Sequence, residues 1–257
     1  MRIVIKVGTS TLTHSTGKLN IKLVEKLCKV ISDIKNAGNE IILVSSGAIG
    51  MGMGKLTLKE RPSDIPTKQA CAAVGQCELM YTYDKLFSEY RHNVAQILIT
   101  GEDMESDKRR NNFHNTLFKL LELQVLPIIN ENDSIATEEI AIGDNDTLGA
   151  IVAVNANADL LVLLSDIDGL YTKDPHYNDD AQLIGEVLKI DDKIMALAGG
   201  KKSALGTGGM ETKLHAAKIC MDAGIDMIIA NGKDPDIFYD IVEGKNVGTR
   251  FKSQVRV

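Results

Sequence analysis

Short apolar runs alternate along the whole chain with stretches of helical period. Six of these runs hold four to six residues and are rich in valine, isoleucine and leucine; they cover residues 3–7, 41–44, 94–99, 125–129, 160–164 and 227–230. A nearly continuous apolar run of this length is typical of a parallel strand buried on both faces. The pattern therefore predicts six strands of a mainly parallel sheet.

The stretches between the runs predict amphipathic helices. Asn20 can cap the first helix, which ends at Gly38 and carries apolar residues every three or four positions. Further helices are predicted over residues 68–90, 111–124, 146–155, 211–223 and 236–243. Residues 132–141 predict a small polar hairpin. Residues 171–183 predict a connecting segment, because they show no strong hydrophobic period. Alternating strands and helices indicate an α/β fold with helices on both faces of the sheet.

Composition and charge indicate a globular protein that does not mainly bind nucleic acid or membranes. The 257 residues are 44% hydrophobic and 25% charged, which is ordinary for a globular chain. This length fits one or two domains, and we expect one large domain over residues 1–257. The net charge of −6 argues against nucleic acid or an anionic membrane as the main partner. The start of the chain does not resemble a signal peptide, and no apolar run is long enough to cross a membrane.

The cysteines do not suggest a disulfide framework or a zinc site. The four cysteines form no Cys-x-x-Cys pair, and none lies near a histidine at zinc-ligand spacing. Cys28 and Cys220 fall within helical apolar patterns, which predicts buried free thiols. Free thiols fit a reducing compartment, so we expect a cytoplasmic protein.

Polar and glycine-rich segments follow at least four of the predicted strands. These segments are residues 8–10, 45–50, 130–133 and 165–171. Ligands of parallel α/β proteins bind at the carboxyl ends of the strands, so these segments are expected to share one site.

Two lysines are candidates for contact with phosphate. Lys6 could be an edge-strand lysine that reaches water, but Gly8 follows closely and allows a phosphate to approach the backbone. Lys213 follows the glycine-rich residues 206–209 at a predicted helix start, which indicates either a phosphate cradle or a surface loop with a solvated lysine. The loop is not a Walker A motif. Ser46 and Gly47 also precede a predicted helix, as an anion site or as a simple N-cap.

Two clusters of carboxylates are further candidate site residues, but their sequence pattern does not indicate what they do. Asp144 and Asp146 fit a turn with a helix cap, and Glu131 and Asp133 could form another turn. There is no EF-hand spacing, no Gly-x-Ser-x-Gly and no clustering of the histidines. The absence of Gly-x-Gly-x-x-Gly after the first strand disfavours a nicotinamide enzyme. Lysines, glycine-rich strand ends and ordering carboxylates are the groups that phosphoryl transfer needs.

Six segments in this order resemble the amino acid kinase family, and within it the branch that phosphorylates glutamate. They are residues 6–10, 45–49, 129–133, 143–146, 165–171 and 206–213, and the resemblance runs from Arg2 to about Thr249. It implies a three-layer αβα sandwich around a mainly parallel sheet. ATP would lie over the C-terminal half and L-glutamate over the N-terminal half.

The resemblance implies transfer of the γ-phosphoryl group of ATP, with Mg²⁺, to the side-chain carboxylate of L-glutamate. The products would be glutamyl 5-phosphate and ADP, in the first step of proline biosynthesis. Lys6 and Lys213 would stabilise the transferring phosphoryl group, and Asp146 would orient them. The implied glutamate-binding residues are Ser46, Gly47, Asn130, Asp133 and Asn145. The implied nucleotide-binding residues are Lys6, Gly8, Ser165, Asp166, Thr207, Gly208, Gly209, Met210, Glu211, Thr212 and Lys213, and no protein ligand to a metal is implied.

Regulation and assembly are expected from the same resemblance. Proline would act as a feedback inhibitor, and the enzyme would be a dimer or a tetramer. Many members continue into a PUA domain, which we do not expect in this chain. The alternatives are a kinase of acetylglutamate, aspartate or UMP, and a non-catalytic nucleotide-binding protein on the same fold. A Rossmann oxidoreductase is the least favoured.

Overall fold

The computed structural model describes residues 1–14, 18–136, 142, 144–175, 177–198 and 209–254. Its centre is an eight-stranded sheet with the strand order β3-β4-β2-β1-β5-β7-β8-β6. The strands are β1 (Arg2–Val7), β2 (Glu40–Ser45), β3 (Val94–Ile99), β4 (Leu126–Glu131), β5 (Leu160–Ser165), β6 (Glu186–Val187), β7 (Asp226–Asn231) and β8 (Thr249–Phe251). Every pairing is parallel except that of β7 with β8. The predicted mainly parallel α/β sheet is confirmed.

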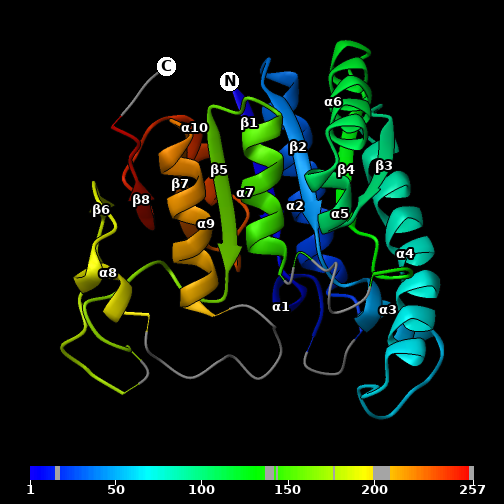
Figure 1. Ribbon diagram of the computed structural model, residues 1–257, viewed down its shortest axis with the longest axis horizontal. Coiled ribbons are helices and arrows are strands. Elements are labelled where there is room, and N and C mark those ends of the chain that lie inside the picture. Colours follow the sequence, from blue (N-terminus) through cyan, green and yellow to red (C-terminus); the bar gives the residue numbers. More distant parts are fainter. Residues whose placement is uncertain (15–17, 137–141, 143, 176, 199–208, 255–257) are drawn as a thin grey trace.

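Helices cover both faces of the sheet and complete the expected three-layer αβα sandwich (Figure 1). They are α1 (Thr9–Leu12), α2 (Ile21–Asn36), α3 (Ala48–Lys55), α4 (Ile65–Ser88), α5 (Gly101–Glu105), α6 (Asp107–Glu122), α7 (Asn145–Asn155), α8 (Asp192–Ala196), α9 (Met210–Asp222) and α10 (Ile237–Val242). Helices α6, α7 and α9 contribute to one buried apolar cluster, while α2, α4 and α10 contribute to the other. None of the helices in the described part of the chain is long and apolar enough to cross a membrane.

Strand β1 lies in the middle of the sheet, between β2 and β5. Its residues alternate between the two apolar clusters: Val4 belongs to one, whereas Ile3 and Ile5 belong to the other. Lys6 pairs in register with Val44 of β2 and Leu163 of β5. The lysine therefore lies at the carboxyl end of the central strand, where the ends of its parallel neighbours also meet.

The predicted elements differ from the observed ones mainly at their ends. Helix α4 begins three residues before the predicted start because the side chain of Asp64 accepts a hydrogen bond from the Thr67 amide and Pro66 fits the first turn. Strands β6 and β8 were not predicted because they hold only two and three residues. Of the predicted hairpin, residues 132–136 form a turn, and residues 137–141 lie outside the described part of the chain.

Two helices next to the candidate site pack unusually closely. A Cβ atom placed on Gly75 of α4 would lie 1.7 Å from the carbonyl oxygen of Ala48, at the start of α3. A Cβ atom on Gly52 of α3 would lie 1.9 Å from the carbonyl oxygen of Cys71 in α4. Only glycine allows this approach. The position of the turn before α3 therefore depends on α4.

The cysteine prediction is confirmed for Cys28 and Cys220, which are buried and free. Burial in an apolar environment raises the pKa of Cys220 to about 12 and also raises the pKa of Cys28. Both thiols are therefore protonated at neutral pH and unreactive.

Candidate active site

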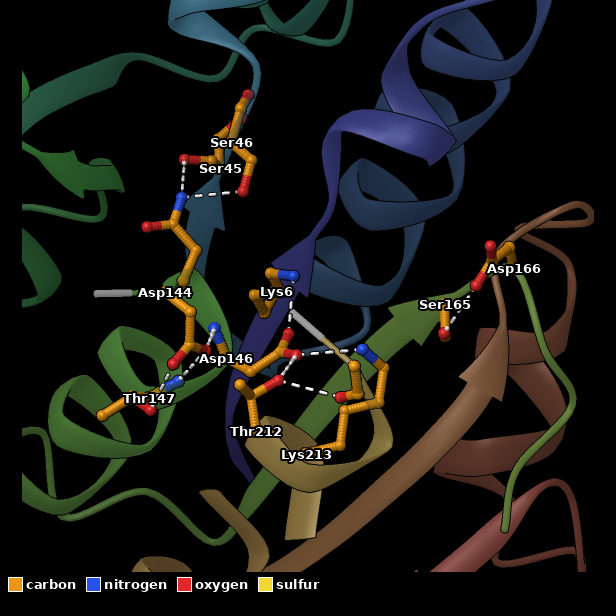
Figure 2. A network of polar contacts seen from close by, with 12 residues as sticks. Lys6, Ser45, Ser46, Asp144, Asp146, Thr147, Ser165, Asp166, Thr212 and Lys213 are labelled. Atoms are coloured by element: carbon orange, nitrogen blue, oxygen red, sulfur yellow. Dashed lines mark hydrogen bonds and ion pairs between the residues drawn. The ribbon is translucent and has the colours of Figure 1, made fainter. Parts of the chain in front are cut away.

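A buried carboxylate joins the two candidate lysines. One Asp146 oxygen lies 2.6 Å from the ammonium nitrogen of Lys6, and the other lies 2.9 Å from that of Lys213 (Figure 2). The three residues come from β1, the first turn of α7 and the first turn of α9. The structure thus brings together three residues that lie far apart in the sequence.

The three side chains are almost fully withdrawn from water. Lys6 and Lys213 are each 8% exposed and Asp146 is 1% exposed. Burial alone would raise the pKa of Asp146, but attraction to Lys6 and Lys213 outweighs it and holds the pKa at about 2. With both lysines protonated, the group carries one net positive charge, which suits a polyanionic ligand.

Local capping explains the position of Asp146. Asp144 is the N-cap of α7, and its side chain accepts hydrogen bonds from the amides of Asp146 and Thr147 at 2.8 and 2.9 Å (Figure 2). The hydroxyl of Thr212 in α9 donates to Asp146 at 3.1 Å. The simple cap interpretation thus accounts for Asp144, whereas Asp146 faces the lysines.

Most of the predicted glutamate-binding residues form a second cluster beside this centre. The side-chain amide of Asn145 lies 2.7 Å from the Ser46 hydroxyl and 3.0 Å from the Asn130 side-chain oxygen. Gly47 is the N-cap of α3 and has a φ of +100°, a conformation that favours glycine. Asn145 immediately precedes Asp146, so this cluster adjoins the lysine pair.

Asp133, the remaining predicted glutamate residue, lines a neighbouring cavity of about 240 Å³. The lining residues are Ala48, Ala72, Ala73, Gln76, Cys77, Gln96, Leu98, Glu131, Asn132, Asp133 and Ser134. Burial raises the pKa of Asp133, and burial together with the charges of Asp133 and Asp144 raises that of Glu131. The lining holds two carboxylates and no cation, so the cavity favours a positively charged group.

The predicted nucleotide residues are placed only in part. Ser165 and Asp166 follow β5 and hydrogen bond to each other at 3.2 Å (Figure 2). They line a cavity of about 390 Å³ together with Ser10, Thr11, Asn20, Lys22, Leu23, Lys26, Gly232, Lys233 and Asp234. A Cβ atom on Gly8 would lie 3.4 Å from the Lys6 ammonium, so glycine leaves room there.

The glycine-rich segment before α9 is described from Gly209 onwards. Gly209 is the N-cap of α9, and Met210, Glu211 and Thr212 lie in its first turn. Thr207 and Gly208 lie outside the described residues. The described residues include no group of three or more His, Cys, Asp or Glu side chains that could hold a metal ion.

Glu131, Gln76 and Gln96 line the same cavity as Asp133 but are not among the predicted site residues. Glu131 lies within the Asn-Glu-Asn-Asp segment, so its neighbours were a usable signal. Gln76 is one amide within a long helix and Gln96 one polar residue in a strand, and neither stands out without the fold.

Comparison with known proteins decides the family. The model of the amino acid kinase family matches residues 1–231. The chain belongs to the amino acid kinase family. It is 54% identical over 254 residues to the glutamate 5-kinase of Clostridium perfringens, covering 97% of this chain and 94% of that protein.

A second relative and a solved structure agree with this assignment. The chain is 55% identical over 251 residues to the glutamate 5-kinase of Carboxydothermus hydrogenoformans, covering 97% of this chain and 67% of that protein. The fold is also that of a carbamate kinase from Giardia lamblia, with a TM-score of 0.71 at 18% identity over 98% of each chain.

Proposed function

We propose that this protein phosphorylates the side-chain carboxylate of L-glutamate with ATP, forming glutamyl 5-phosphate and ADP in the first step of proline biosynthesis. The observation that carries the proposal is the buried Lys6–Asp146–Lys213 group beside Asn145 and the acidic cavity. The glutamate 5-kinases that match nearly the whole chain at more than 50% identity support the substrate.

The chemistry follows from the two lysines. A glutamate carboxylate oxygen attacks the γ-phosphorus, and the bond from phosphorus to the β,γ-bridging oxygen breaks, so ADP leaves with the electron pair. The attacking carboxylate is already ionised and no general base is needed. Lys6 and Lys213 stabilise the charge on the transferring group and the leaving oxygen. Asp146 holds both ammonium groups in place and offsets their mutual repulsion.

Mg²⁺ fits this site as part of the MgATP substrate. In kinases the ion is commonly held by the phosphates with one or two carboxylates rather than by an all-protein cage. Both oxygens of Asp146 already face ammonium groups at 2.6 and 2.9 Å, so we assign the ion to the phosphates and not to Asp146. Bound there, it supplies additional neutralisation of phosphate charge.

Glutamate recognition is assigned to the second cluster and the acidic cavity. Asp133 pairs with the α-ammonium group, because its carboxylate lines a cavity without a cation. Ser46 and the backbone at Gly47 receive a carboxylate, with Asn130 and Asn145 beside them. The nucleotide is assigned to Gly8, Ser165, Asp166 and the segment from Thr207 to Lys213.

This assignment separates glutamate from related substrates. N-acetylglutamate has no α-ammonium group and would leave Asp133 unpaired, which corresponds to roughly 10³-fold selectivity or more. The shorter side chain of aspartate would misplace its carboxylate by ~1 Å, which can reduce the rate by 10²-fold.

A panel of substrates tests the proposed function. ADP release is measured with MgATP and glutamate, aspartate, N-acetylglutamate or UMP, each over a range of concentrations. We expect kcat/KM for glutamate to exceed the others by at least about 10². A higher value for N-acetylglutamate, aspartate or UMP would assign the protein to another branch, and ATP binding without turnover of any substrate would favour a non-catalytic role.

Regulation, assembly and location are part of the same proposal. Proline shares part of the chemistry of glutamate, so we propose that it competes for the glutamate site in a cytoplasmic dimer or tetramer. Proline should raise the apparent KM for glutamate without changing the maximal rate. Light scattering should give at least twice the mass of the chain; a stable monomer would contradict the assembly alone.

A further inference from the structure

A chain of side-chain amides connects the glutamate cluster to helix α4. The Asn130 amide nitrogen donates to the Gln76 side-chain oxygen at 3.0 Å, and the Gln76 amide nitrogen donates to the Gln96 side-chain oxygen at 3.4 Å. Asn130 is 1% exposed and Gln76 is 8% exposed. We propose that Gln76 is a positioning residue for glutamate recognition, acting through Asn130 on Asn145; this inference rests on the proposed function.

Backbone groups fix the direction of every hydrogen bond that the proposal uses. The Glu131 amide can only donate, and it lies 2.9 Å from the Asn130 side-chain oxygen. The nitrogen of Asn130 must therefore face Gln76 and donate to it. At the other end, the Ser45 carbonyl can only accept, and it lies 3.1 Å from Asn145. The nitrogen of Asn145 must then face the serines.

The fixed direction determines what the cluster presents to a substrate. Asn145 uses its two amide hydrogens on three acceptors: the Ser45 carbonyl, the Ser46 hydroxyl and the Asn130 side chain. The oxygen of Asn145 is left to accept a hydrogen from an ammonium group. The hydroxyl of Ser46 already accepts a hydrogen, so its own hydrogen is free to donate to a carboxylate.

Gln76 supplies the acceptor that keeps this arrangement in place. Without its side-chain oxygen, the buried Asn130 nitrogen would have no acceptor, and only the hydrogen bonds accepted by the Asn130 oxygen would hold the amide. Any displacement that brings the nitrogen to another acceptor would move the oxygen away from the Glu131 amide and from Asn145. Neighbouring Gly75 holds α4 against the start of α3, which places the Gln76 side chain at this point.

The test compares Gln76→Met with Gln182→Met. Methionine keeps the length of the side chain and removes the acceptor. Gln182 is exposed and lines neither of the two cavities described above, so its loss leaves the Asn130 bond intact. We expect Gln76→Met to raise the KM for glutamate about tenfold, with kcat and the KM for ATP changed less than threefold. Gln182→Met should change all three less than threefold.

A double variant separates positioning from a change in cavity shape. If Gln76 acts through Asn130, Gln76→Met should have no further effect on glutamate KM in an Asn130→Ala background. Multiplying effects in the double variant, or an unchanged KM in Gln76→Met, would overturn the inference. Equal losses in kcat and in both KM values, with a lower thermal midpoint, would assign Gln76 a structural role and overturn it too. An inactive wild-type protein would instead reject the proposed function.

Discussion

Replacing Asp146 by asparagine should destabilise the protein because it leaves two buried ammonium groups without their counter-ion. In the wild type, the carboxylate is 1% exposed and lies 2.6 and 2.9 Å from the two lysines. Removing one member of a buried ion pair commonly costs about 3–5 kcal/mol. We therefore expect Asp146→Asn to lower the free energy of unfolding by about 3 kcal/mol at pH 7.

The pKa of Asp146 gives a second measure of the same interaction. Its value is about 2 in the folded protein, below the ordinary value of 3.8. The shift in pKa corresponds to about 2 kcal/mol of stability. This value is smaller than the roughly 3 kcal/mol expected for Asp146→Asn because it already includes the cost of burying the carboxylate. A lowered pKa stabilises the folded protein fully above pH ~4, and this stability is lost as the pH falls towards 2. Asp146→Asn should lack that part of the acid dependence.

Urea unfolding at pH 7 and at pH 3 measures both effects. Asp107→Asn is the control, because Asp107 is an exposed carboxylate that also pairs with a cation, Arg110. Its free energy of unfolding should change by less than about 1 kcal/mol. If Asp146→Asn is within about 0.5 kcal/mol of the wild type at pH 7, the lysines are not held by the carboxylate as described.

A triple variant tests whether the charged Lys6–Asp146–Lys213 group contributes to the free energy of unfolding or serves catalysis alone. Buried ion pairs replaced together by apolar residues often leave stability unchanged or increased. We expect Lys6→Met/Asp146→Leu/Lys213→Met to recover most of the stability lost in Asp146→Asn while having no kinase activity. A triple variant less stable than Asp146→Asn would mean that the group is mainly structural.

Three further predictions concern catalysis, recognition and packing. Lys6→Ala and Lys213→Ala should each lower kcat by roughly 10²–10³-fold with little change in the KM for glutamate; near wild-type turnover in steady-state assays would remove the assigned role. Asp133→Asn should raise the KM for glutamate sharply and leave ATP binding intact. Because burial raises the pKa of Asp133, the wild-type kcat/KM for glutamate should begin to fall with acid at a higher pH than that of the variant, in which the substrate carboxylate still titrates. Gly75→Ala should lower the free energy of unfolding by about 3 kcal/mol or more, measured by thermal or urea unfolding. Gly185→Ala should leave it unchanged, because a Cβ atom there meets nothing within 4 Å.

The sheet could be predicted from the sequence because its buried strands are almost wholly apolar. Strand β5 is buried at all six positions, so its sequence is a short, continuous apolar run, and its length is that of a strand rather than a helix. Strand β8 has three residues and is stabilised by pairing with β7, a contact that no local pattern encodes. The start of α4 depended on the Asp64 cap rather than on the apolar period.

Site residues that belong to a sequence motif could be predicted. Residues that only the fold brings to the site could not. Lys6 and Lys213 each had a simpler local interpretation, and only the resemblance to a family indicated that Asp146 joins them. The fold supplies the reason, since the carboxyl end of β1 and the first turns of α7 and α9 bring the three side chains into contact. Gln76 carried no such signal because its role depends on the Asn130 amide, 54 residues further along the chain.

The most direct measurement is formation of glutamyl hydroxamate. The protein is incubated with MgATP, L-glutamate and hydroxylamine, which traps an acyl phosphate, and the product is identified by mass. The account predicts glutamate-dependent γ-glutamyl hydroxamate in amounts equal to the ADP released, formed roughly 10²–10³-fold more slowly by Lys213→Ala. ADP release with no hydroxamate, or hydroxamate at wild-type rates from Lys213→Ala, would contradict it.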